Sequence, residues 1–322
     1  MFKRFASLAV LALSLSISAQ AADLTAWSPQ PEEHPTTIAL QGMLKRLKET
    51  SSRLDSSLMP VAAASNQNKL IAGLQSGEIG VAVITPSTVA RLAPQARVLA
   101  LPFLFRDSKQ MFKQLDGEVG KELEQSMATQ GVVLLGWYDG GTRSFYMRNR
   151  PPRSISDLDG LKVRIPNRAD LRETVSALGG VPQVLAYQDV NAAFEAGNID
   201  AAENDLLSYE ADQHYKRAKF FVTTSHAVQY EALVVSAVVW NKLSDAERAG
   251  LREAGRDSAL ADREIWAKRM IAARMRLEKE GVKFVDQRDS MAFASRVTAT
   301  YKPYMENPVT APLLLKLMTA KG

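Results

Sequence analysis

The sequence predicts an α/β protein of two lobes, with a long helix that spans both of them. From Leu24 onward, short apolar runs rich in β-branched residues alternate with helical patterns, which favours a sheet covered by helices. Several of these runs are apolar almost without interruption, as is typical of strands buried on both faces of a sheet. The two lobes are expected to be joined by more than one crossing of the chain.

The N-terminal unit combines strands and helices in this alternating order. Its predicted strands are Leu24–Trp27, Ile79–Val83, Val98–Leu101, Val132–Trp137 and Ser144–Arg148. Its predicted helices are Thr36–Lys48, Ser65–Gln75 and Gly117–Gln130. Gly77 is placed to end the second of these helices, because glycine takes the left-handed conformation common after a helix.

A second unit of the same style follows, and the chain then returns to the first. The predicted strands of the second unit are Lys162–Ile165, Val181–Ala186 and Ile199–Glu203, and its predicted helices are Arg168–Leu178 and Val190–Ala196. The returning strand is Glu231–Trp240, in which Leu233, Val234, Val235, Val238 and Val239 favour burial. We therefore expect residues 22–142 with about 231–270 to form lobe I. Residues 143–230 with about 271–322 are expected to form lobe II.

One helical segment is unusually long. Ser244 and Glu247 form the signature of a capping box at its start, and Gly281 stands where a C-terminal cap belongs. An unbroken helix over 245–280 would be about 54 Å long at 1.5 Å per residue, which exceeds one lobe. Gly250 and Gly255 leave open the alternative of two helices with a turn between them.

The first residues predict an export signal. Lys3 and Arg4 precede an apolar run, and the small residues near Ala21 suit a signal peptidase, so residues 1–21 are interpreted as a signal peptide. The chain contains no cysteine, which excludes disulfides, thiolate metal sites and a lipidated cysteine anchor. We expect a periplasmic protein that is not lipid-anchored and is a monomer.

Charge and motifs argue against several functional classes. The 40 Lys and Arg residues are interleaved with 35 Asp and Glu residues, without the basic block expected of a nucleic-acid-binding protein. No nucleophile elbow, zinc-protease helix motif, P-loop or dinucleotide-binding glycine motif is present. The three histidines, His34, His214 and His226, do not have metal-ligand spacing. We predict neither a metal nor a cofactor, and no enzymatic activity.

Two arginines on strand-like segments are the leading candidates for ligand binding. Arg164 precedes Pro166 at the carboxyl end of a predicted strand, which is where ligands bind in open α/β sheets. Its guanidinium cannot deprotonate and requires a carboxylate or phosphate partner when it is buried. An internal ion pair with Asp159 or Glu203 is the alternative. Arg143 follows two glycines, which permit a close approach of the backbone, or is simply a turn residue.

Other side chains near the predicted loops are weaker candidates. Asn204 follows a strand and offers an acceptor and two donors, although asparagine there is often a turn former. Aromatic residues that could line a pocket are Trp27, Phe105, Trp137, Tyr187, Tyr209 and Tyr230, although most of them are expected to belong to the core.

Five segments of the chain occur together in a known family. They are Leu101–Asp107, Gly141–Phe145, Ser156–Pro166, Ala177–Pro182 and Ile199–Asn204. In this order and spacing they resemble the solute-binding proteins of tripartite ATP-independent periplasmic (TRAP) transporters. Two further segments, Glu33–Pro35 and Trp240–Leu243, are similar to the family pattern, and Glu33 joins the candidate residues on that ground.

The resemblance implies a two-lobed periplasmic binding protein fold, type II-like, that closes on a small organic acid. It implies delivery to a membrane permease with a small and a large subunit. It also implies that Arg164 binds the ligand carboxylate, with Arg143 and Asn204 as supporting contacts. One departure is Asp205, where many members carry proline, because its carboxylate could repel a second anionic group of a ligand. The alternatives are an ABC-type or sensor-associated binding protein, and a periplasmic enzyme acting on organic acids.

Overall fold

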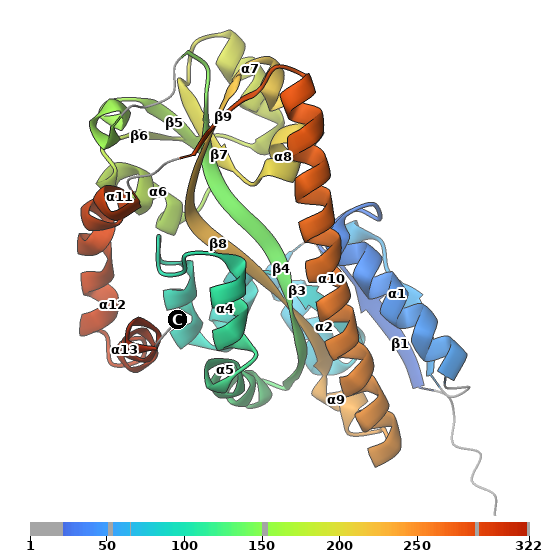
Figure 1. Ribbon diagram of the computed structural model, residues 1–322. Coiled ribbons are helices and arrows are strands. Elements are labelled where there is room, and N and C mark those ends of the chain that lie inside the picture. The colour runs from blue at the N-terminus through green and yellow to red at the C-terminus, as the bar shows by residue number, and fades with distance from the viewer. Residues whose placement is uncertain (1–21, 51–53, 65, 150–153, 287–289, 321–322) are drawn as a thin grey trace, which may run out of the picture.

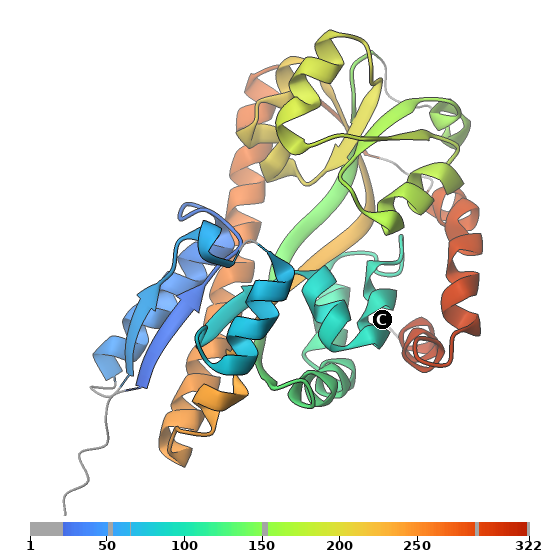
Figure 2. The same cartoon turned by 180° about the vertical axis from the view of Figure 1, so that it is seen from behind.

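The computed structural model describes residues 22–50, 54–64, 66–149, 154–286 and 290–320. The predicted signal peptide, residues 1–21, lies outside this range. Figures 1 and 2 show two lobes, and long strands and one long helix run between them. None of the helices within the described ranges is both long enough and apolar enough to cross a membrane.

Within the described residues, a mixed sheet of nine strands runs through both lobes, in the order β2-β1-β3-β8-β4-β7-β5-β6, with β9 paired to β8. The strands are β1 (Ala22–Trp27), β2 (Leu54–Leu58), β3 (Val81–Ile84), β4 (Val132–Met147), β5 (Lys162–Ile165), β6 (Val181–Val184), β7 (Ala201–Asn204), β8 (Phe220–Ser236) and β9 (Lys283–Asp286). Lobe I contains β1, β2 and β3, and lobe II contains β5, β6, β7 and β9. The long antiparallel strands β4 and β8 belong to both lobes.

The β4–β8 pair is irregular where it crosses between the lobes. Its register shifts between Leu134 and Gly136, between Asp139 and Thr142, and between Arg143 and Phe145. Gly141 has a φ of 81°, a left-handed conformation that glycine adopts without steric cost. These bulges bend the strands and interrupt the ladder at the place where two lobes would rotate against each other.

Helices cover both faces of the sheet. They are α1 (Pro35–Thr50), α2 (Gln67–Ser76), α3 (Pro86–Leu92), α4 (Ser108–Leu115), α5 (Glu118–Ala128), α6 (Ala169–Ala177), α7 (Val190–Glu195), α8 (Leu206–Ala211), α9 (Ala237–Trp240), α10 (Asp245–Lys279), α11 (Ser290–Val297), α12 (Lys302–Glu306) and α13 (Ala311–Thr319). Gly77 has the predicted left-handed conformation at the end of α2.

Helix α10 is unbroken over 35 residues, which confirms the prediction of one long helix and not two helices with a turn between them. Ser244 and Glu247 form the predicted capping box at its start. Along its length α10 contacts α1 in lobe I, β4 at the crossing and α8 in lobe II, and Figure 1 shows it beside both lobes. Gly255 does not break the helix. A Cβ atom there would lie 2.7 Å from the Leu135 side chain, so the glycine lets α10 approach β4 closely.

The described residues form four apolar core clusters, two in each lobe. Leu313, Leu314 and Leu317 of α13 pack in the lobe I cluster that also contains Leu99 and Leu123. The chain therefore descends through α11 and α12 to end against lobe I, as Figure 1 shows. This packing contradicts the expectation that the whole segment 271–322 belongs to lobe II, because the apolar face of α13 is buried against lobe I.

Several predicted elements need correction. Val98–Leu101 is not a strand, because residues 94–100 form a 3₁₀ segment. The two strands predicted at 132–137 and 144–148 are the single strand β4. The strand predicted at Glu231–Trp240 ends at Ser236, and residues 237–240 form α9, so Val238 is exposed rather than buried in a sheet.

Candidate ligand-binding site

A cleft of about 1280 Å³ lies between the lobes. Lobe I contributes the loop after β1 and the 3₁₀ segment Pro94–Ala100, and lobe II contributes the ends of β5 and β7 with the following segments. The β4–β8 crossing and one face of α10 also line the cleft. The volume exceeds the range of about 300–1,000 Å³ that typical small-molecule sites occupy, so the lobes stand far enough apart to admit a ligand.

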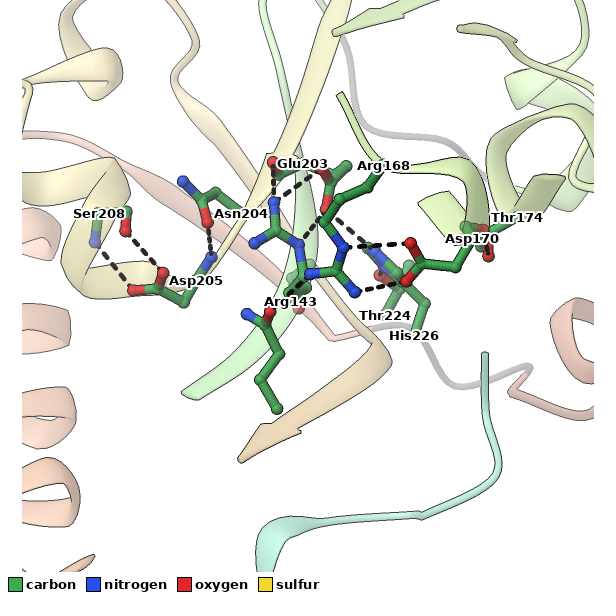
Figure 3. Close-up of polar contacts among 12 residues, drawn as sticks. Arg143, Arg168, Asp170, Thr174, Glu203, Asn204, Asp205, Ser208, Thr224 and His226 are labelled. Atoms are coloured by element: carbon green, nitrogen blue, oxygen red, sulfur yellow. Dashed lines mark hydrogen bonds and ion pairs between the residues drawn. The ribbon is translucent and has the colours of Figure 1, made fainter. Parts of the chain in front are cut away.

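Arg143 lies in the cleft wall, and Glu203 on the neighbouring strand β7 neutralises its charge. The Nε and Nη2 atoms of Arg143 both donate to the Glu203 carboxylate, Nη2 at 2.7 Å from Oε1, and Nη2 also donates to the Glu203 carbonyl (Figure 3). Burial would raise the pKa of Glu203, but the Arg143 guanidinium and nearby His226 outweigh it and hold the pKa at about 2. Among the described residues, nothing accepts a hydrogen bond from Nη1 of Arg143.

Arg164 has no acidic partner within the described parts of the chain. Its side chain is 2% exposed, and its Nε and Nη2 atoms donate to the backbone carbonyl of Leu185 at 3.0 and 2.8 Å. Asp159 and Glu203 were the two acids considered as internal partners of Arg164. Neither forms an ion pair with it, because Glu203 pairs with Arg143 and Asp159 pairs with Arg296. Burial lowers the pKa of Arg164, which reflects the cost of holding this charge away from water.

Arg164 does not itself line the cleft but lies next to a residue that does. Its guanidinium carbon is 5.9 Å from the centre of the Tyr187 ring, at the outer limit of a cation–π contact, and Tyr187 is part of the cleft wall. Tyr187 in turn donates to the carbonyl of Ser208. Movement of this tyrosine would therefore change the access of a ligand to Arg164.

Asn204 lines the cleft, as predicted for a ligand-binding residue, and the neighbouring Asp205 has a structural role. The Asn204 Oδ1 atom accepts from the backbone N–H of Asp205, which leaves the amide NH₂ group with its donors available. Asp205 caps α8, because its Oδ1 accepts from the Ser208 N–H at 2.9 Å and its Oδ2 accepts from the Ser208 hydroxyl (Figure 3). Asp205, which stands where many family members carry proline, thus caps the start of α8.

The remaining predicted residues divide into two groups. Glu33, Tyr187 and Tyr230 line the cleft. Trp27 and Phe105 do not, because both are buried in the apolar core of lobe I, and the indole N–H of Trp27 donates to the carbonyl of Val61.

The sequence interpretation missed other cleft residues. Arg168 lines the cleft and forms an ion pair with Asp170, while its Nη1 donates to Gln229 at 2.9 Å (Figure 3). Its position two residues after Pro166 was the one available signal. Trp266 and Glu231 also line the cleft, and neither has a motif that would have revealed it.

Two buried acids, Glu231 and Asp262, lie together with the partly buried Asp139 where α10 meets the β4–β8 crossing. The Oδ2 atom of Asp262, on α10, accepts from the backbone N–H of Asp139 at 2.6 Å, and Glu231 is near enough to influence both carboxyls. Burial is the largest cause in each case, and it raises the pKa of Asp139 to about 6, that of Glu231 to about 7 and that of Asp262 to about 9. These groups are therefore wholly or partly protonated near neutral pH.

In the described part of the chain, no group of three or more His, Asp or Glu residues has an arrangement that could hold a metal ion. His34 is the one histidine among the residues lining the cleft, and burial lowers its pKa to about 4. Cationic donors, amides and aromatic faces make a surface suited to holding a polar anion.

Comparison with known proteins identifies the family. Residues 28–307 match the family model described as bacterial extracellular solute-binding protein, family 7. A solute-binding protein of Chromohalobacter salexigens is 30% identical over 97% of this chain and 94% of its own length.

Two solved structures show the same fold. A TRAP periplasmic solute-binding protein from Chromohalobacter salexigens, with bound D-glucuronate, has a TM-score of 0.83 at 29% identity, over 92% of this chain and 100% of its own. Another from Sulfitobacter sp., with bound β-D-galacturonate, has a TM-score of 0.81 at 27% identity, again over 92% of this chain and 100% of its own. The chain therefore belongs to the family 7 bacterial extracellular solute-binding proteins, the binding components of TRAP transporters.

Proposed function

We propose that this protein captures a small carboxylate-bearing molecule of the hexuronate class between its lobes and delivers it to a TRAP-type permease with a small and a large subunit. Residues 1–21 direct it to the periplasm, where it acts as a monomer and releases its ligand chemically unchanged. The hexuronate assignment is supported by the glucuronate and galacturonate bound to the two structural relatives.

The observation that carries the proposal is the buried guanidinium of Arg164, which has no acidic partner among the described residues. A buried cation without an acidic partner destabilises the ligand-free protein, and a ligand carboxylate would remove that cost. The planar fork of the guanidinium can bind both carboxylate oxygens, although two of its donors must first leave the Leu185 carbonyl or share it. Support for the same end of the ligand comes from Nη1 of Arg143 and the amide of Asn204.

Binding is coupled to closure of the lobes. Glu33 and Tyr230 lie on the lobe I side, whereas Tyr187 and Asn204 lie on the lobe II side, so a ligand that touches both sides stabilises the closed state. The bulged β4–β8 crossing supplies the hinge, and α10 supports both lobes during the movement. The permease then recognises the closed form, in which the two lobes present one continuous surface.

The variant Arg164→Lys tests the proposal. Lysine keeps the charge but loses the bidentate geometry, and we expect the affinity for D-glucuronate or D-galacturonate, measured by isothermal titration calorimetry, to fall at least a hundredfold. This corresponds to the lower part of the 3–5 kcal/mol associated with breaking a buried charge pair. Arg172→Lys, at an exposed position on α6, is the matched control. Unchanged affinity in Arg164→Lys would refute the role of Arg164.

A ligand screen provides a test that does not depend on a variant. Thermal unfolding of the unmodified protein is measured against a library of organic acids that contains uronates, dicarboxylates, keto acids and sialic acid. A ligand present at a hundred times its Kd stabilises the folded state by about 2.7 kcal/mol, which raises Tm by several degrees. If no organic acid in the library raises Tm, the proposed function is wrong.

A further inference from the structure

Glu231 is a buried carboxyl in the cleft wall without a cationic partner in the described parts of the chain. It is 5% exposed, its Oε2 accepts from the Thr36 hydroxyl at 3.0 Å, and its Oε1 lies 3.4 Å from the Gln30 amide nitrogen. Two oxygens provide about four acceptor positions, so these contacts satisfy only part of the group. The unused positions require hydrogen-bond donors, and a ligand in the cleft can supply them.

A second unsatisfied polar group lies in the same wall. The indole nitrogen Nε1 of Trp266 is buried without a hydrogen-bond partner in the described structure, and the whole side chain is 2% exposed. The ring meets His34 edge-on at 5.5 Å, and the Nδ1 atom of His34 lies 3.4 Å from the backbone nitrogen of Thr36, whose hydroxyl donates to Glu231. The cleft wall therefore has an acceptor without enough donors, the Glu231 carboxyl, and a donor without an acceptor, the Trp266 indole N–H.

The charges on this side of the cleft do not compensate Glu231. His34 is neutral near pH 7, because burial lowers its pKa to about 4. Arg269, a cleft arginine on α10, donates to the backbone carbonyl of Glu33, and it has no ion pair with Glu231 in the described structure. The lobe I end of the cleft thus has an acid without a cationic partner, whereas near the lobe II end Arg164 has no acidic partner among the described residues.

We propose that Glu231 and Trp266 form a hydroxyl-reading wall that selects polyhydroxylated monocarboxylates and discriminates against dicarboxylates. This inference rests on the proposed function, since it assigns the lobe I end of the same cleft. Hydroxyl groups can satisfy both residues, because a hydroxyl can donate a hydrogen bond to Glu231 or accept one from the Trp266 indole N–H. Burial raises the pKa of Glu231 to about 7, so its ionised form dominates above neutral pH. A second carboxylate can only accept, and placed beside the ionised Glu231 it would add a repelling charge.

The spacing along the sheet suits a ligand with two different ends. Arg143 is paired in register with Ala227, and Glu231 lies four residues further along β8, at about 13 Å for 3.3 Å per residue. The lengths of the two side chains reduce the gap that a ligand must bridge. A six-carbon sugar acid carries a carboxylate at one end and hydroxyl groups at the other.

A panel of matched ring compounds tests this assignment by calorimetry. The probes are D-glucuronate, cyclohexanecarboxylate without hydroxyls, trans-1,4-cyclohexanedicarboxylate, and trans-4-(aminomethyl)cyclohexanecarboxylate with an ammonium group. We expect D-glucuronate to bind the unmodified protein most tightly. In Glu231→Gln at pH 8, where the wild-type Glu231 carboxyl is mainly ionised, we expect the affinity for D-glucuronate to fall by about tenfold to a hundredfold, the effect of losing one hydrogen bond to a charged group. The affinity for cyclohexanecarboxylate should be unchanged, and the dicarboxylate should bind more tightly than before.

Two further variants separate recognition from folding. Glu32→Gln makes the same chemical change at an exposed neighbouring position and should leave every affinity unchanged. Trp266→Phe removes the indole N–H while keeping an aromatic ring, and it should weaken D-glucuronate but not cyclohexanecarboxylate. Tm of each variant is measured alongside, and a folded Trp266→Phe protein still tests the wall if Glu231→Gln is unfolded.

The outcomes distinguish this inference from the proposed function. If the unmodified protein binds none of the acids, the proposed function itself fails. If it binds acids but Glu231→Gln and Trp266→Phe lose glucuronate and cyclohexanecarboxylate equally, or lose neither, the hydroxyl-reading wall is wrong. Tightest binding of the ammonium-bearing acid, lost in Glu231→Gln, would show that the wall recognises a cation instead.

Discussion

Replacing Asp262 by asparagine should stabilise the protein, and the gain should grow as the pH rises. Asp262 is fully buried on α10, and one of its carboxyl oxygens, Oδ1, has no hydrogen-bond partner in the described structure. Burial raises its pKa from 3.8 to about 9, and the neighbouring carboxyls of Asp139 and Glu231 add to the effect. Asparagine has nearly the same shape, and its carbonyl oxygen can accept the backbone N–H of Asp139 as the carboxyl does now.

The magnitude follows from the linkage between proton binding and folding. The folded protein holds the Asp262 proton more tightly than the unfolded chain, so this group's contribution to stability is complete below pH 3.8 and is lost as the pH rises toward about 9. At pH 7 the loss extends over about three pH units, or roughly 4 kcal/mol at 1.36 kcal/mol per unit. An asparagine side chain does not titrate and avoids this loss, so we expect Asp262→Asn to gain about 2–4 kcal/mol at pH 7 and less at pH 5.

Denaturant unfolding at pH 5, 6, 7 and 8 measures this difference. The contributions of His34 and His214, whose pKa values burial lowers to about 4, act in the opposite direction but cancel when the two proteins are compared at each pH. Asp257→Asn, at a more exposed position on the same helix, is the control and should change stability by no more than about 0.5 kcal/mol. A difference that stays constant with pH, or shrinks as the pH rises, would refute the buried-acid interpretation.

Two further substitutions test the buried ion pair of Arg143 with Glu203 and the packing at the β4–β8 crossing. Glu203→Gln should destabilise the protein by about 3–5 kcal/mol, because the buried Arg143 guanidinium loses its counter-charge; a denaturation midpoint close to that of the unmodified protein would contradict this. Gly141→Ala should cost about 1–2 kcal/mol, because φ is 81° and the new Cβ would lie 3.0 Å from Trp266 and 3.2 Å from Asp205. It should also weaken ligand binding through the displaced Trp266, and calorimetry showing normal affinity would argue against Trp266 as a ligand contact.

Local signals predicted some elements well. The strand Lys162–Ile165 has the predicted bounds because alternation defines its faces and Pro166 ends it. The capping box at Ser244 fixed the start of α10, and no proline interrupts the helical pattern that follows. In both cases the deciding interactions lie within a few residues of one another, where a single sequence contains them.

Other elements depended on distant parts of the chain. Val98–Leu101 is apolar enough for a strand, but periodicity cannot separate a short buried strand from a buried helical turn. Strand β2, residues Leu54–Leu58, is polar in its centre and forms the sheet edge beside β1, so its pairing and not its composition makes it a strand. The first half of β8 mixes polar and apolar residues and is defined by β4 alongside it.

The two arginines show why the site could be predicted only in part. Arg143 and Arg164 look alike in the sequence, and Glu203 was a nominal partner for Arg164. The register of β7 on β4 places Phe145 opposite Glu203, and this brings the glutamate to Arg143, 60 residues away in the chain. No local pattern contains that register, which depends on how the lobe II strands order themselves in the sheet.

Because Glu203 pairs with Arg143 and not with Arg164, the charges in the inner part of the site can be added simply. Arg143 and Arg164 contribute two positive charges, Glu203 contributes one negative charge, and His226 is neutral because burial lowers its pKa. Asp205 already serves the N-terminus of α8, and Arg168 is satisfied by Asp170. The Asp205 carboxylate lowers this surplus, and the N-terminal dipole of α8 offsets that carboxylate in part. At most one positive charge therefore remains for a ligand, which a single carboxylate neutralises and a second would overcompensate. Glu203 thus sets the charge of the preferred ligand without touching it, and the surplus favours the monoanionic acid that the lobe I wall independently requires.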